Sequence, residues 1–145
     1  MPGKESLVPQ DWFHKADADV QTVGILLAHG GNMEVAAMHI QQAVEKYLKG
    51  YLLVTGWELD RIHDLPALLD EAVARNAAYD QFREFCETVN AFYFEARYPF
   101  MVEPPSEEEV RNFLEQTKQL IEFILAELSS SQQQLNNLDE DGKVE

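Results

Sequence analysis

Apolar residues recur every three or four positions along most of the chain, which is the spacing of one face of an α-helix. Asp11 is placed to cap a first helix, and Gly30-Gly31-Asn32 to end it, because glycine and asparagine adopt the left-handed C-terminal conformation at low cost. The apolar stripe of this helix comprises Trp12, Ala16, Val20, Val23 and Leu27.

Two further helices are predicted before the middle of the chain. The second runs from about Met33 to about Thr55, and the third is a short helix over about 65–76 that Asp64 caps and that carries Pro66 in its first turn. The stripe of the second helix comprises Ala36, Ile40, Ala43, Tyr47, Tyr51 and Val54.

The fourth helix is predicted over about 80–96, and it ends before Pro99, which disfavours helix in the residue that precedes it. A fifth helix over about 107–128 begins with a capping box of Ser106 and Glu109. Its stripe is the clearest in the chain and comprises Val110, Phe113, Leu114, Thr117, Leu120, Ile121, Ile124, Leu125 and Leu128.

These patterns predict an all-α protein, namely an antiparallel helical bundle of four main helices and one short helix. Residues 1–9 are interpreted as a flexible arm and residues 10–128 as the bundle. Residues 129–145 are rich in Ser, Gln, Asn and acidic residues, and we expect a disordered acidic tail there.

Composition limits the classes of partner. The 145 residues carry 11 Lys and Arg against 26 Asp and Glu, a net charge of −15. Because DNA and anionic membranes attract cationic surfaces, we expect neither as a partner. The single cysteine, Cys86, lies on an apolar stripe and excludes an internal disulfide. Without an apolar leader at the start, the expected location is the cytoplasm.

Beside its core stripe, the second helix has a polar stripe whose four members share an arc of about 80°. An imidazole, an amide and two ammonium groups on one face suit a phosphate or a nucleotide, and a solvated flank with a Glu45–Lys49 pair is the alternative. The members of the stripe are His39, Gln42, Lys46 and Lys49.

Two other segments are candidates for the same site. Arg97-Tyr98-Pro99 holds an arginine, the preferred side chain for bidentate phosphate contact, although a helix-terminal arginine also interacts with the helix dipole. His63-Asp64 is either an imidazole oriented by a carboxylate or a loop histidine beside a helix cap. No motif for a metal, a cofactor or a phosphate-binding loop is present, so we expect none of these.

Several segments together resemble the HEPN domain family: DWFHKADADV at 11–20, HIQQAVEKYLKGYLL at 39–53, HDLPALL at 63–69 and ARYP at 96–99. The resemblance implies a helical bundle that is usually a homodimer. Many members are encoded beside a minimal nucleotidyltransferase, and the family was proposed to bind nucleotides. Many others are metal-independent RNases, including toxins of toxin–antitoxin pairs.

The RNase members carry Arg, four to six residues and then His. Arg97 matches the arginine, but residues 98–104 contain no histidine. Because metal-free RNA cleavage needs a base that titrates near neutrality, the resemblance favours a noncatalytic nucleotide- or phosphate-binding module that acts with a nucleotidyltransferase-type partner.

One alternative is an RNase that uses Arg97 with His39 or His63, with nucleotide or a small RNA as the ligand. The other is a structural or dimerisation module. Its candidate interface consists of the aromatic residues Tyr51, Trp57, Tyr98 and Phe100.

Overall fold

The computed structural model describes residues 5–97 and 103–143, and it confirms the all-α bundle. Side chains are described for 5–92 and 103–137. Four long helices, one short helix and a 3₁₀ turn follow one another along the chain. They are α1 (Pro9–His29), α2 (Met33–Val54), α3 (Leu65–Arg75), η1 (Ala77–Phe82), α4 (Arg83–Arg97) and α5 (Glu107–Lys143).

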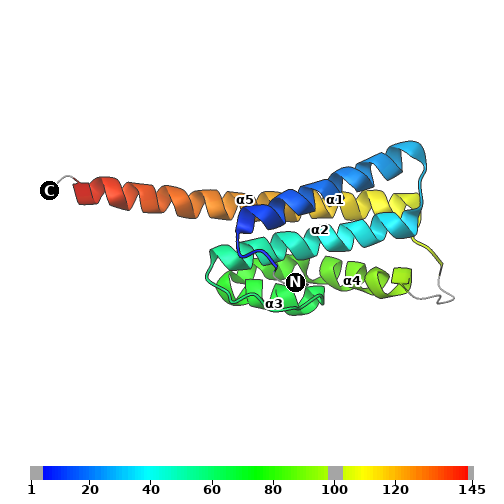
Figure 1. The fold of residues 1–145 in the computed structure, drawn as a ribbon, viewed down its shortest axis with the longest axis horizontal. Helices are drawn as coiled ribbons and strands as arrows, with labels where there is room; N and C mark the ends of the chain where they lie inside the picture. The colour runs from blue at the N-terminus through cyan, green and yellow to red at the C-terminus, as the bar shows by residue number, and fades with distance from the viewer. Residues whose placement is uncertain (1–4, 98–102, 144–145) are drawn as a thin grey trace.

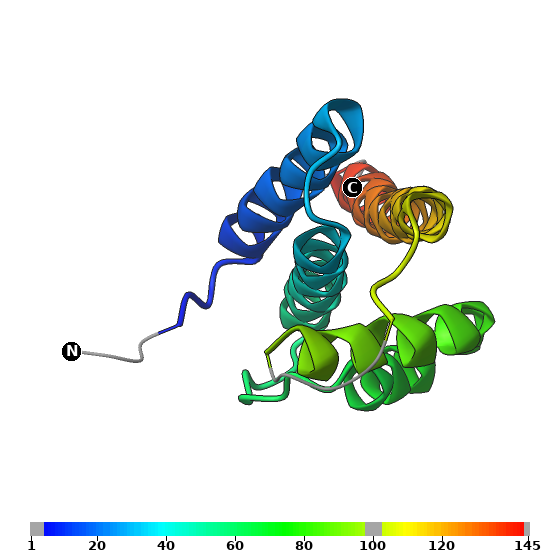
Figure 2. The same ribbon diagram turned by 90° about the vertical axis from the view of Figure 1, so that its right-hand side faces the viewer.

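The long helices alternate in direction, with α1 and α4 running one way and α2 and α5 the other (Figure 1). Seen end-on, α2 lies at the centre, with α1, α5 and the α3–α4 layer around it (Figure 2). Residues around most of the circumference of α2 are therefore buried in the core. The buried residues of α2 are Ala36, Ala37, Ile40, Gln41, Ala43, Val44, Tyr47, Leu48, Lys49, Gly50, Tyr51 and Leu52.

The helix ends for which the sequence carries a capping signal follow that signal with one exception. Gly30 takes the left-handed conformation (φ 67°) after α1, and the Asn32 side chain accepts a 3.0 Å bond from Val35 N at the start of α2. The predicted capping box is confirmed by a 3.1 Å bond from Glu109 N to Ser106 Oγ. The exception is Asp11, which lies in the first turn of α1, because Pro9 already begins that helix.

Several predictions about burial need correction. Val54 and Leu125, which belong to the predicted apolar stripes of their helices, are 50 % and 45 % exposed. In α1, Phe13 is 5 % exposed and belongs to the core, whereas Trp12 and Val20 are only partly buried. Tyr51, a proposed interface residue, is 2 % exposed because its ring packs on Tyr79 with centroids 4.8 Å apart. Since α2 is surrounded by other helices, it has buried residues on more than one of its sides.

The last helix is longer than the sequence pattern indicated. We expected the helix to end near Leu128 and a disordered tail to follow, whereas α5 continues to Lys143. No proline or glycine occurs between Leu128 and Gly142, so nothing in this segment forces the helix to stop. This part of α5 extends past the other helices (Figure 1).

Candidate functional site

Two side chains of the polar stripe on α2 converge on one carboxylate from α1. Asp19 Oδ1 lies 2.8 Å from His39 Nδ1, and Asp19 Oδ2 accepts a 2.6 Å hydrogen bond from Lys46 Nζ. The Asp19 side chain is only 8 % exposed, while those of His39 and Lys46 are each 24 % exposed. His39 and Lys46 therefore do lie close together, but the acidic group of Asp19 lies between them.

A second carboxylate, that of Glu45, contacts Lys49 of the stripe and also His63 and Gln41. Its Oε2 lies 3.5 Å from Lys49 Nζ, and both of its oxygens lie 3.3 Å from His63 Nδ1. Gln41 Nε2 donates to Glu45 Oε1 and to the carbonyl of His63 at 3.2 Å each. The Glu45–Lys49 pair expected in the alternative interpretation is thus present.

Lys49 is the least accessible member of the stripe. Its side chain is 1 % exposed, and its ammonium lies 5.3 Å from the centroid of the Trp12 ring. A buried ammonium is stabilised by its carboxylate and by the electron-rich face of an indole. Because Glu45 and Trp12 already surround Lys49, this cation does not face an open surface where a phosphate would bind.

His63 and Asp64 are adjacent in the chain but contact different groups. The Asp64 side chain accepts a 3.3 Å bond from Ala67 N and so caps α3, as predicted, and it also accepts a 2.7 Å bond from Asn90 Nδ2 of α4. The carboxylate beside the imidazole of His63 is Glu45, on α2. With 53 % of its side chain exposed and Nδ1 turned towards Glu45, His63 presents the opposite edge of its ring to solvent.

The charges of this network balance. Two carboxylates, Asp19 and Glu45, face two ammonium groups, Lys46 and Lys49. A third carboxylate, that of Asp17, accepts a hydrogen bond from the hydroxyl of Tyr47. Burial, followed by this hydrogen bond and the charge of Asp17, raises the pKa of Tyr47. The stripe therefore offers no surplus of positive charge to an anion.

The remaining candidates lie elsewhere or outside the described residues. Gln42 is partly buried on α2. Arg97 is the last residue of α4, its side chain is not described, and Tyr98 and Phe100 lie outside the described residues. Arg97 follows Asn90 by seven residues, which corresponds to about 10 Å along the helix axis.

An open cavity of about 350 Å³ lies where the N-terminal segment meets α1 and α2. Lys46 is the only member of the predicted site among the described residues that line it. The ring of Trp12 has the flat face that nucleobases stack on. The lining residues are Glu5, Ser6, Asp11, Trp12, His14, Lys15 and Lys46.

The two residues that organise the network, Asp19 and Glu45, are not among the site residues predicted from the sequence. Asp19 lies one turn after Ala16 and one turn before Val23, so a charged residue on the buried side of α1 was visible in the pattern. Glu45 was considered only as a partner of Lys49. Its contact with His63, 18 residues away in the chain, depends on how the 56–64 connection folds back against α2.

Two absences apply to the part of the chain that the structure describes. It contains no group of three or more His, Cys, Asp or Glu side chains arranged to hold a metal ion. None of its helices has the length and apolar composition needed to cross a membrane.

The thiol of Cys86 is buried in the core. This burial is the main cause that raises the pKa of the thiol to about 12.

The fold and the network define an all-α bundle with a charge-balanced polar cluster between α1 and α2. The model of the HEPN domain family matches residues 9–128, and the chain belongs to this family. Among solved structures, the chain is similar to ST0689, an archaeal HEPN homologue, with a TM-score of 0.67 and 21% sequence identity. The similarity covers 83% of this chain and 97% of that one. The comparison with curated proteins found no match.

Proposed function

We propose that this HEPN-domain protein is a noncatalytic module that acts by binding a protein partner of the nucleotidyltransferase type. The observation that carries the proposal is the pairing of His39 and Lys46 with the buried carboxylate of Asp19. The carboxylate of Asp19 holds the imidazole of His39 in place and neutralises the ammonium group of Lys46. Neither side chain therefore offers an unpaired positive charge to a phosphate. The absence of a histidine in residues 98–104 supports the same conclusion.

The noncatalytic role is tested with the purified protein and total RNA in the presence of EDTA. We expect the RNA to stay intact over a range of protein concentrations. Association is tested by co-expressing the chain with a minimal nucleotidyltransferase from the same genome and measuring the mass of the product by sedimentation. A stable complex of fixed stoichiometry is expected. Separate sedimentation of the two proteins would contradict the proposed partner.

The finer proposal is that the module also binds a nucleotide or phosphate. The cavity that Lys15 and Trp12 line supports it, because an ammonium group and an aromatic ring border one space there, whereas the ammonium of Lys46 in the same lining is already paired with Asp19. Glu5 and Asp11 border the same space and weaken its attraction for anions. Calorimetric titration with ATP, GTP and inorganic phosphate measures this directly. Lys15→Ala should weaken binding, and an unchanged affinity would refute this location.

RNA cleavage is the second candidate function, and one observation favours it. His63 is half exposed and its Nδ1 faces Glu45, which is how a carboxylate orients an imidazole that acts as a base. Cleavage in EDTA that is lost in both His63→Ala and Glu45→Gln, but not in His29→Ala, would establish this function. His29 is the control because it is exposed at the end of α1 and does not line the cavity of Lys15 and Trp12.

A further inference from the structure

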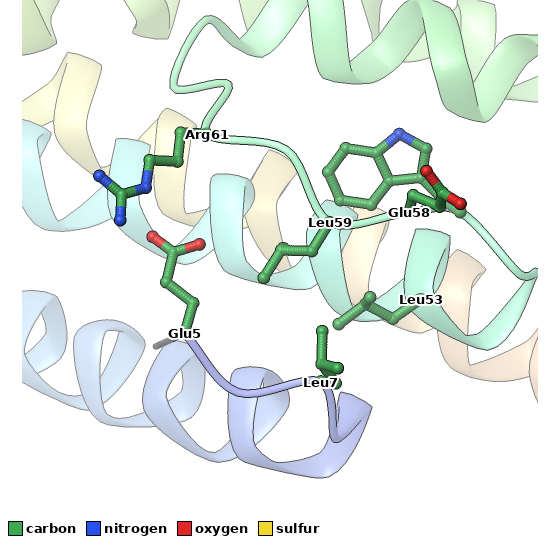
Figure 3. Close-up of a pocket in the computed structure, with 7 residues that line it drawn as sticks. Glu5, Leu7, Leu53, Glu58, Leu59 and Arg61 are labelled. Atoms are coloured by element: carbon green, nitrogen blue, oxygen red, sulfur yellow. The ribbon is translucent and has the colours of Figure 1, made fainter. Parts of the chain in front are cut away.

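A second cavity, of about 780 Å³, lies between the N-terminal segment and the connection that follows α2. Its volume is within the range typical of ligand pockets. Figure 3 shows two contrasting ends: the side chains of Leu7, Leu53 and Leu59 converge at one, and Glu5 and Arg61 face each other at the other. Trp57 and Glu58 complete the lining.

The apolar end is open to solvent. Leu7 is 70 % exposed although it precedes α1 in a segment that is held in place, since Trp12 Nε1 donates a 2.8 Å hydrogen bond to Ser6 O. Leu53, Trp57 and Leu59 are each only partly buried. An anchored leucine that stays exposed beside three other apolar side chains leaves an apolar wall that a ligand can cover.

The acidic end contains an acceptor without a donor. Glu5 Oε2 is buried and has no hydrogen-bond partner among the described residues. A buried carboxylate oxygen that lacks a donor is costly, and a carboxylate can accept several hydrogen bonds at once. Arg61 faces Glu5, but it interacts with another part of the chain. The oxygen Oε2 of Glu5 therefore still lacks a hydrogen-bond donor. Glu58 adds a second, exposed carboxylate to the lining.

The geometry points to a binding site for a lysine side chain presented by an apolar segment of a protein partner. The alkyl stem of the lysine lies along Leu7, Leu53 and Leu59, and its ammonium group reaches the carboxylate of Glu5, which lines the cavity. Lysine suits such a site because its four-carbon stem packs on apolar surface while its charge reaches a carboxylate. A body with a net charge of −15 attracts basic segments and repels acidic ones. This inference rests on the proposed role as a partner-binding module.

Three capped peptides test the chemistry: acetyl-Leu-Lys-Leu-amide, the same peptide with norleucine in place of lysine, and the same peptide with glutamate. Binding is followed by the NMR resonance of the Trp57 indole N–H, assigned with a Trp57→Phe variant. We expect saturable shifts with the lysine peptide and about tenfold weaker binding of norleucine, which lacks only the ammonium group. Equal affinity for lysine and norleucine peptides would overturn the assignment.

Protein variants test the role of Glu5. Glu5→Gln should weaken binding of the lysine peptide about tenfold and leave the norleucine affinity unchanged. Glu122→Gln, an exposed position on α5, makes the same change in net charge and should have no effect. If both variants weaken binding equally, the attraction is a general effect of charge and the site is refuted.

The two proposals fail separately. A partner complex that forms normally with the Glu5→Gln protein would refute this site and leave the partner-binding role intact. Specific, Glu5-dependent peptide binding without any complex with a nucleotidyltransferase would refute that partner and leave the site intact.

Discussion

Replacing Asp19 with asparagine tests whether the network between α1 and α2 stabilises the fold. The variant keeps the size of the side chain and removes the charge that His39 and Lys46 share. Hydrogen bonds to charged groups contribute about 1.5–3 kcal/mol, and removing one partner of a buried pair costs about 3–5 kcal/mol. Because the Lys46 side chain is 24 % exposed and can turn to solvent, we expect a loss of about 2–4 kcal/mol in the free energy of unfolding.

The assay is urea unfolding at neutral pH, followed by the helical circular dichroism signal. The double variant Asp19→Asn, Lys46→Met removes both members of the ion pair and should recover part of the loss, since residues in contact couple by about 0.5–3 kcal/mol. Glu115→Gln, on the exposed side of α5, is the control for net charge. A loss no larger than that of this control would refute the stabilising role of Asp19.

Three further predictions concern the core. Gly50→Ala places a Cβ 2.5 Å from Phe13 Cε1 and should destabilise the fold by about 1–3 kcal/mol in urea unfolding, whereas Gly24→Ala meets nothing within 4 Å and should stabilise it by up to about 1 kcal/mol. Burial, together with a carboxylate hydrogen bond, raises the pKa of Tyr51 from 10.0 to about 12, so its contribution to stability is complete below pH 10 and is lost as the pH rises towards 12. Urea titrations at increasing alkaline pH should show this decline, and Tyr51→Phe should reduce it; an unchanged decline in that variant would assign it to other groups. With its thiol pKa raised to about 12 by burial, Cys86 should react with a disulfide reagent only as fast as the protein opens, and immediate reaction of the folded protein would contradict its core position.

The sequence was sufficient for the helices and for most of their ends. Asn32, Asp64 and Ser106 cap helices by local rules, and local rules act within a few residues of the chain. The features that could not be predicted from the sequence depend on how the helices pack against one another. The apolar stripe of the second helix already included Tyr51, but excluding Tyr51 from an interface requires the knowledge that Tyr79 of η1 packs on its ring.

The candidate site shows the same division. The spacing of His39 and Lys46 placed them on one face correctly, because helical periodicity is local. Whether that face attracts an anion depends on Asp19, 20 and 27 residues away in the chain, which arrives through the pairing of α1 with α2. A pattern of cations on one helix therefore indicates where charges lie, while the neighbouring helix decides their balance.

The central place of α2 has a consequence for the dynamics of the bundle. Its backbone amides are shielded by α1, α3, α4 and α5 together, so exposing them to solvent requires several helices to separate at once. The slowest hydrogen–deuterium exchange should therefore come from the middle turns of α2 and approach the rate set by global unfolding. A partner that binds the folded bundle at any place would slow exchange of these amides by its binding free energy, so exchange at α2 reports how tightly a partner binds, and exchange at the outer helices reports where it binds.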